Sequence, residues 1–233
     1  MTKDLASGRK QDVRTRVLRS HDRFWRVEDF NGDAKAVDMS LRRLAAAGEI
    51  ERVRRGVYWR GRATRFGRAV ASPVEAVRKI VGNREAVGAA EWYATNLLGL
   101  STQVPPTPAI AVSRRAPTGL DDVRIIDRAS RTGRRDAGLT DLEVTLLEAL
   151  EGWDRYVEVD SGTATKRFVD VLRRDDVRVG RLVGAAETES SRVRERLRYV
   201  LERAGLHIEA ARVTGARTRS GRDSALAVVG PKS

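Results

Sequence analysis

Basic side chains in two neighbouring segments are the groups best suited to bind another molecule. Lys35, Arg42 and Arg43 fall in a segment of helical periodicity. Arg54 and Arg55 follow in a turn that ends with glycine. Ammonium and guanidinium groups donate hydrogen bonds to phosphate oxygens, and they also reach base edges in the major groove of DNA. We therefore expect these five residues to bind DNA.

The elements that would position these side chains lie between residues 33 and 59. Asp33 is a good helix N-cap, because its carboxylate can accept a hydrogen bond from a first-turn N–H. Gly48 stands where a left-handed residue commonly ends a helix. Short apolar stretches at residues 50–53 and 57–59 predict a hairpin with Arg54, Arg55 and Gly56 at its tip. The apolar stripe of the predicted helix consists of Val37, Leu41, Leu44 and Ala45.

The preceding residues complete a winged helix-turn-helix pattern over residues 1–60. A first helix is expected over residues 4–19, and the apolar residues Phe24, Val27 and Phe30 predict a short helical turn. A helix followed by a basic-tipped hairpin is the shape that enters a major groove and contacts the flanking phosphates. Three aromatic residues could stack on bases, although packing beneath the hairpin is favoured: Trp25, Tyr58 and Trp59.

Charge is concentrated in the same part of the chain. Of the net charge of +13, residues 1–72 carry 18 Lys and Arg against 9 Asp and Glu, whereas residues 73–233 carry 27 against 23. Release of counterions from phosphates makes such a local excess a common source of affinity for nucleic acid. Only 6 of the 45 basic residues are lysine, so an arginine-rich composition explains part of the excess. The coincidence of charge and motif favours DNA binding.

Length and composition limit the class of protein. A chain of 233 residues with 41% hydrophobic and 33% charged residues suits a globular protein of two small domains. No apolar run approaches the ~18 residues of a membrane-spanning helix, so we expect no membrane partner. Cysteine is absent, which excludes disulfides and thiolate metal sites. The first residues lack the apolar core of a secretory signal, so the expected location is cytoplasmic.

Few residues suggest catalysis. His21 and His207 have no neighbouring nucleophile and no ligand-spaced partner, which argues against a zinc site or a histidine-based triad. The chain also lacks a phosphate-binding GxxxxGK[ST] loop, a GxGxxG motif after a strand and a GxSxG elbow. We therefore expect no enzyme activity, no cofactor and no metal. Several carboxylates could bind Mg²⁺ in a nuclease, although acidic residues beside turns need no such role: Asp121, Asp122, Asp127, Glu158 and Asp160.

The rest of the chain predicts an arginine-rich basic linker at residues 61–71 and a second domain at residues 72–233. Proline after Ser72 and the spacing of Thr140 and Glu143 mark two helix starts. The second domain mixes helices with short strands, so the expected fold class is α+β. Its predicted helices include residues 85–98, 164–174 and 189–204, and its predicted strands are residues 109–112 and 123–126. Between them we expect an irregular proline loop at residues 101–108 and a basic turn at residues 131–138. The domain is expected to end in a β-hairpin within residues 206–229.

Together, several segments resemble the AbiEi family of antitoxins, which belong to type IV abortive-infection toxin–antitoxin systems. The resemblance covers residues 8–205 and is most specific at NLLGLSTQVP, residues 96–105. In this loop Asn96 and Gln103 could contact a partner or fasten the backbone locally. Further segments are SGRKQDV, RFWRVEDF, AVDMSLRRLAAAGEIERVRRGVYW and PTPAIAVS. The arginine-rich linker and the closing hairpin depart from the commoner form of the family.

This resemblance implies a bacterial cytoplasmic protein with two tasks. Its winged helix would repress its own operon by binding inverted repeats, either as a monomer or as a weak homodimer on DNA. Its second domain would neutralise a nucleotidyltransferase-like toxin, without the need for a stable complex. The DNA-reading role would fall on Lys35, Arg42 and Arg43, with Arg54 and Arg55 in the wing.

Two alternatives remain open. The chain could be a stand-alone winged-helix regulator whose second domain senses a ligand or mediates assembly. It could also be a DNA-processing enzyme, in which case metal-dependent cleavage should be lost on Asp127→Ala or Asp160→Ala.

Overall fold

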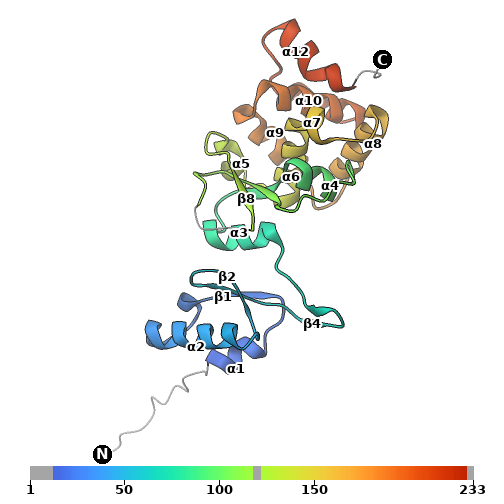
Figure 1. The fold of residues 1–233 in the computed structure, drawn as a ribbon. Helices are drawn as coiled ribbons and strands as arrows, with labels where there is room; N and C mark the ends of the chain where they lie inside the picture. Colours follow the sequence, from blue (N-terminus) through green and yellow to red (C-terminus); the bar gives the residue numbers. More distant parts are fainter. Residues whose placement is uncertain (1–12, 118–121, 230–233) are drawn as a thin grey trace, which may run out of the picture. The chain divides into compact units, whose positions relative to one another are not determined.

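The computed structural model describes residues 13–117 and 122–229, and the chain divides into two compact units, Met1–Ile80 and Val81–Ser233 (Figure 1). Helices dominate and the strands form small sheets, so the fold is α+β, as the sequence predicts. The predicted boundary between residues 71 and 72 lies one helix before this division. Within the described residues, no helix has both the length and the apolar character needed to cross a membrane.

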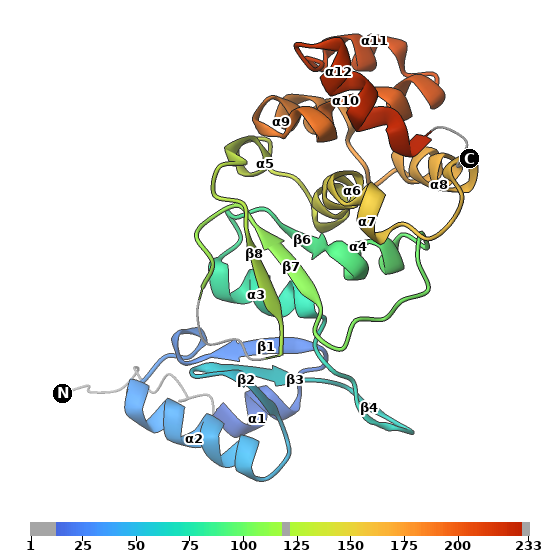
Figure 2. The same cartoon turned by 45° about the horizontal axis from the view of Figure 1, so that its top comes forward.

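Unit 1 consists of short helices on one face of a three-stranded antiparallel sheet with the order β1-β3-β2 (Figure 2). The predicted hairpin is confirmed, because β2 and β3 pair directly. The elements in chain order are α1 (Val13–Leu18), β1 (Arg23–Arg26), the 3-10 turn η1 (Val27–Asp29), α2 (Ala34–Ala46), β2 (Glu51–Arg54) and β3 (Val57–Arg60).

Both ends of α2 form as the sequence predicts. The Asp33 carboxylate accepts hydrogen bonds from the backbone N–H groups of Lys35 at 3.3 Å and Ala36 at 3.2 Å. At the other end Gly48 adopts a left-handed φ of +68°, and the next N–H donates to the carbonyl of Leu44 at 3.0 Å. A side chain at Gly48 would strain this turn, because L-residues rarely adopt positive φ.

The core of unit 1 forms where the apolar stripe of α2 meets the sheet. Trp25 and Tyr58 belong to this core and are 1% exposed, whereas Trp59 packs against Phe24 and is 5% exposed, so the prediction that all three pack inside is confirmed. Trp25 stacks on Phe30 with ring centroids 5.0 Å apart. These rings are therefore closed to bases.

One prediction in unit 1 is wrong. Residues 23–26 form strand β1 rather than part of a helical turn, because their backbone pairs with β3 from Arg23↔Arg60 to Arg26↔Val57. Only residues 27–29 form a turn of helix. Of the predicted first helix, residues 4–12 lie outside the described part of the chain, and α1 begins at Val13.

The segment predicted as a linker contains a small hairpin of its own. Strands β4 (Ala63–Thr64) and β5 (Gly67–Arg68) pair antiparallel. Helix α3 (Pro73–Val81) then begins at the predicted proline.

Unit 2 places helices around a second three-stranded sheet, in which β6 (Val87–Ala90) pairs antiparallel with β7 (Ala109–Val112), and β7 pairs parallel with β8 (Arg124–Asp127). The remaining elements are α4 (Glu91–Leu97), α5 (Thr132–Asp136), α6 (Asp141–Glu151), α7 (Trp153–Tyr156), α8 (Ser161–Leu172), α9 (Val179–Ala185), η2 (Ala186–Thr188), α10 (Ser191–Arg203), α11 (His207–Arg212), α12 (Arg219–Leu226) and η3 (Ala227–Val229).

Several predictions in unit 2 are confirmed. Thr140 and Glu143 form a reciprocal capping box at the start of α6. Strands β7 and β8, helices α8 and α10, and the irregular proline loop lie close to their predicted positions.

The predicted helix at residues 85–98 is wrong in its first half, because residues 87–90 form strand β6. All four are buried, and a Cβ atom on Gly88 would lie 2.7 Å from Val144 of α6. Close packing of α6 on this strand therefore requires glycine there. A short run of small buried residues carries no periodicity that separates a strand from a helix.

Two further segments are helical where the sequence predicts a turn or a hairpin. Residues 132–136 of the predicted basic turn form helix α5, and Arg134 within it is 1% exposed. The predicted closing hairpin is instead the helix pair α11 and α12, which packs against α10. Thr218 caps α12 by accepting from the N–H of Gly221 at 3.1 Å. Contact with α10, rather than pairing between the two apolar runs, buries Ala210 and Ala225.

Candidate nucleic-acid interface

Helix α2 directs its predicted DNA-binding residues to solvent because its opposite face is buried. Val37, Leu41 and Leu44 are at most 4% exposed. At 100° per residue, Lys35, Arg42 and Arg43 project from the other side of the helix. All three are exposed. Met39 lies among them and is 45% exposed.

Arg42 has an acidic neighbour on the same helix. Its Nη2 lies 2.8 Å from the Asp38 carboxylate, one turn earlier, and the Arg42 side chain stays 55% exposed. An exposed pair of this kind stabilises a helix by only a few tenths of a kcal/mol. Asp38 can therefore orient Arg42 while leaving it accessible.

The β2–β3 hairpin carries the other two predicted residues. Arg54 ends β2 opposite Val57, and Arg55 is exposed in the turn. Gly56 has a φ of +79°, a left-handed conformation that glycine adopts without steric cost, at the end of this turn. Among the described residues, no ion pair or hydrogen bond involves the side chains of Lys35, Arg43, Arg54 or Arg55.

Both α2 and the β2–β3 hairpin are shaped to contact a DNA duplex. A helix of 13 residues is about 20 Å long, which suits a major groove. Guanidinium groups at the tip of a short hairpin can reach phosphate or minor-groove edges beside that groove.

The arginines of unit 2 have very different surroundings. The carboxylate of Glu148 receives two hydrogen bonds from Arg128, at 2.8 and 2.9 Å, and one from Arg134 at 2.6 Å. Arg134 also donates to both carboxylate oxygens of Glu189, at 2.6 and 2.8 Å. The side chains of Arg134, Glu148 and Glu189 are at most 2% exposed.

The opposite charges of the buried arginines and glutamates keep both kinds of side chain ionised. Burial alone would raise the pKa of Glu148, but the guanidinium groups of Arg134 and Arg128 hold it below its ordinary value. Burial also opposes the charge on Arg134, yet Glu148 and Glu189 raise its pKa. Sequence reasoning missed this network, because Arg134 and Glu189 are 55 residues apart and no local spacing joins them.

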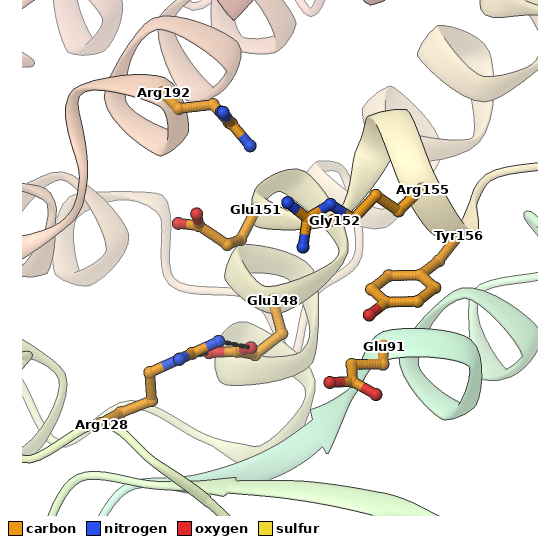
Figure 3. Close-up of a pocket in the computed structure, with 8 residues that line it drawn as sticks. All are labelled: Glu91, Arg128, Glu148, Glu151, Gly152, Arg155, Tyr156 and Arg192. Carbon is orange, nitrogen blue, oxygen red and sulfur yellow. Dashed lines mark hydrogen bonds and ion pairs between the residues drawn. The ribbon is translucent and has the colours of Figure 1, made fainter.

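Above this network lies a polar cavity of about 240 Å³ (Figure 3). Arg155, Arg192 and Glu91 line it from different elements, Arg192 at the upper left of the view, Arg155 at the right and Glu91 below (Figure 3). Glu91 has a left-handed φ of +53° and forms an ion pair with Arg124. Since both signs of charge line it, the cavity is suited to a small polar ligand rather than an apolar one.

Three of the carboxylates considered as metal ligands accept hydrogen bonds from the backbone: Asp127, Glu158 and Asp160. Asp127 accepts from the N–H of Ala129 at 2.8 Å. Asp160 caps α8 through the N–H of Thr163 at 3.0 Å. Asp121 lies outside the described residues, and within them no group of His, Asp and Glu side chains is arranged to hold a metal ion.

Glu158 fixes the proline loop. It accepts hydrogen bonds from the Ser101 hydroxyl, the Thr102 N–H and the Gln103 amide, at 2.8, 3.0 and 3.1 Å. The bond from Ser101, followed by that from Thr102, lowers the pKa of Glu158. Asn96 donates to the carbonyl of Ser101 at 3.4 Å. Asn96 thus fastens the loop locally, which was one of the two interpretations of the sequence, whereas the Gln103 amide ties the loop to Glu158, 55 residues away.

Comparison with known proteins gives a distant likeness to a solved structure. No known protein family matches the chain, and no curated protein does. Among solved structures the chain resembles the crystal structure of Rv2827c protein from Mycobacterium tuberculosis, with 15% identity and a TM-score of 0.48. The match covers 92% of this chain and 84% of that one. At this TM-score the likeness carries no argument about fold or function.

Proposed function

We propose that this chain is a DNA-binding antitoxin. Unit 1 acts as a winged helix-turn-helix that binds inverted repeats in the promoter of its own operon and represses it. Unit 2 neutralises a nucleotidyltransferase-like toxin, the task implied by the resemblance to the AbiEi family. The protein works in the bacterial cytoplasm, without a cofactor or catalytic residue.

The observation that supports DNA binding is uncompensated charge. Four basic side chains of unit 1 project from α2 and from the β2–β3 hairpin without an ion pair to any described residue. Cations that have no ionic partner among the described residues can displace counterions from phosphate. The four are Lys35, Arg43, Arg54 and Arg55.

In the proposed complex α2 lies in the major groove. Lys35 and Arg42 approach base edges, and Asp38 holds the Arg42 guanidinium in place. Loss of a side chain that reads a base should cost about 1–3 kcal/mol on the operator and little on random DNA. A phosphate contact should instead weaken binding to both duplexes alike.

The experiment that tests the proposal measures binding of the full chain to duplexes tiled across its promoter, with random duplexes for comparison. Lys35→Ala and Arg42→Ala should reduce the preference for one duplex. Arg174→Ala is the matched control, since its side chain is 56% exposed and lies in unit 2. Failure of the unaltered chain to bind any duplex at low salt would refute DNA binding.

The antitoxin task needs a separate test in cells. Expression of the neighbouring toxin-like gene should arrest growth, and this chain should relieve the arrest even when Arg54 and Arg55 are both alanine. If no neighbouring gene is toxic, the antitoxin proposal fails while DNA binding can stand.

The cavity in unit 2 favours one second candidate, a stand-alone transcriptional regulator that senses a small polar ligand. Its lining by Arg155, Arg192 and Glu91 offers contacts of both signs. This candidate predicts target promoters elsewhere in the genome, which mapping of the bound DNA in cells would reveal.

A further inference from the structure

Residues 61–71 of unit 1, the segment predicted as a linker, contain a formed hairpin with an aromatic tip. Strands β4 and β5 pair through Ala63↔Arg68 and Thr64↔Gly67, which leaves Arg65 and Phe66 at the apex. The Thr64 hydroxyl donates to the Gly67 carbonyl at 2.7 Å and accepts from the Phe66 N–H at 3.2 Å. Both views of the fold show this β4–β5 hairpin extending beyond the end of β3 (Figures 1 and 2).

The base of the hairpin is fixed to the body of unit 1. The indole N–H of Trp59 donates to the Ala69 carbonyl at 2.7 Å, and the Arg62 N–H donates to the Asp22 carboxylate at 2.9 Å. Arg68 forms an ion pair with Glu49 at 2.8 Å, just after the end of α2. A Cβ atom on Gly61 would lie 1.9 Å from the Ala69 carbonyl oxygen, so the close approach requires glycine. The hairpin is therefore a positioned element of unit 1.

The tip combines a positive charge with an exposed ring. Phe66 is 85% exposed, and the Arg65 guanidinium lies 4.6 Å from the centre of its ring. Residues 61–71 include three arginines and no acidic residue. Arg62 and Arg68 form exposed ion pairs with Asp22 and Glu49, whereas Arg65, beside the ring, forms no ion pair with any described residue.

This chemistry fits the minor groove of DNA. Proteins that bind there insert arginine, whose charge matches the groove, and wedge apolar side chains such as Phe between base pairs. The β2–β3 tip and the β4–β5 hairpin lie at opposite ends of β3, about 13 Å apart along that four-residue strand. The two hairpins thus bracket the part of unit 1 that holds α2.

We propose that the β4–β5 hairpin is a second DNA-binding element: Arg65 enters a minor groove beside the site of α2, and Phe66 wedges against a base step there. This inference rests on the proposed DNA binding by unit 1. It further predicts that the bound DNA is bent and that the protein covers a longer stretch of the duplex.

The test compares full-length variants on the promoter duplex by titration, footprinting and a circular-permutation bending assay. Phe66→Ala should weaken binding about fivefold to a hundredfold and remove the bend. Phe66→Leu should keep the bend, because leucine also serves as a wedge. Arg65→Ala should lower the salt slope by about 0.9. Ile208→Ala, at a residue of unit 2 that is 76% exposed, is the matched control and should change nothing.

The outcomes separate this inference from the proposed function. If the unaltered chain binds with no bend, and Phe66→Ala binds equally well with the same footprint, the hairpin has no DNA role although DNA binding stands. If Phe66→Ala keeps its DNA binding but loses toxin neutralisation, the hairpin binds protein and the inference is overturned. Absence of binding by the unaltered chain would instead refute the proposed function itself.

Discussion

Arg55 in unit 1 and Arg134 in unit 2 are the same residue type in opposite surroundings. Arg55 is exposed in a hairpin turn, with no ion pair among the described residues. Arg134 is 1% exposed and bonds to two buried carboxylates. The difference teaches that the count of arginines says little about binding until the partner of each one is known.

The comparison extends to the units as wholes. In unit 1 the basic residues of α2 and of the β2–β3 tip keep their charge available. In unit 2 the ion pairs of Arg128, Arg134 and Arg178 join helices and loops that are distant in sequence. We therefore expect substitutions of arginine to change DNA affinity in unit 1 and stability in unit 2.

The largest expected effect is on stability. Arg134→Met should reduce the free energy of unfolding by about 3–5 kcal/mol, because Glu148 and Glu189 would lose a buried partner. Arg135→Ala is the control, since its side chain is 42% exposed and should change stability by less than about 0.5 kcal/mol. Denaturant unfolding measures both. Equal stability of the two variants would contradict the claim that the buried arginines of unit 2 stabilise its fold.

Acid should act through the same network. The pKa values of Glu148 and Glu143 are lowered in the folded protein, although burial alone would raise both. The charges and hydrogen bonds of Arg134 and Arg128 outweigh burial at Glu148. Hydrogen bonds from Arg178 outweigh burial at Glu143. A lowered carboxyl pKa stabilises the fold above the ordinary value near 4.5, and this contribution disappears as the pH falls below it. Hydrogen exchange between pH 6 and about pH 3 should show α6 losing protection. Glu143→Gln should make the loss shallower, and an unchanged profile would contradict this assignment.

A smaller effect is expected at the start of α2. Asp33→Ala removes the N-cap and should cost about 1 kcal/mol of stability. DNA affinity should fall with it, because the helix that presents Lys35 would fray. Asp33→Asn should restore both quantities, since the amide oxygen also caps a helix. Loss of affinity with unchanged stability would show that Asp33 acts on DNA directly.

The smallest effect on stability tests the surface pair of α2. Asp38→Ala should cost only a few tenths of a kcal/mol. Removing this negative charge should strengthen binding to random DNA while weakening the preference for the promoter, because Arg42 is released but no longer oriented. Weaker binding to every duplex would contradict this.

The parts of the fold that the sequence predicts are those with local chemical signals. Asp33 and Gly48 mark the two ends of α2, and the pair Thr140 and Glu143 marks the start of α6. Each signal arises from hydrogen bonds between residues close in sequence. The β2–β3 hairpin belongs to the same group, since Gly56 sets its turn.

The parts that escaped prediction depend on distant contacts. Strand β6 lacks β-branched residues except Val87, and its identity follows from pairing with β7. Helices α11 and α12 are set by packing on α10. For the candidate site, the exposed arginines could be named from spacing alone. The buried role of Arg134 could not, because Glu189 is 55 residues away.

The most direct test of the account is the salt dependence of promoter binding by the full chain and by the double variant Arg54→Ala, Arg55→Ala. The account predicts weaker binding to all duplexes and a salt slope reduced by up to about 2, with unchanged stability. The doubly substituted control Arg173→Ala, Arg174→Ala in unit 2 should retain the original slope. Identical slopes for the unaltered chain and the hairpin variant would contradict the claim that the arginines at the β2–β3 tip bind DNA.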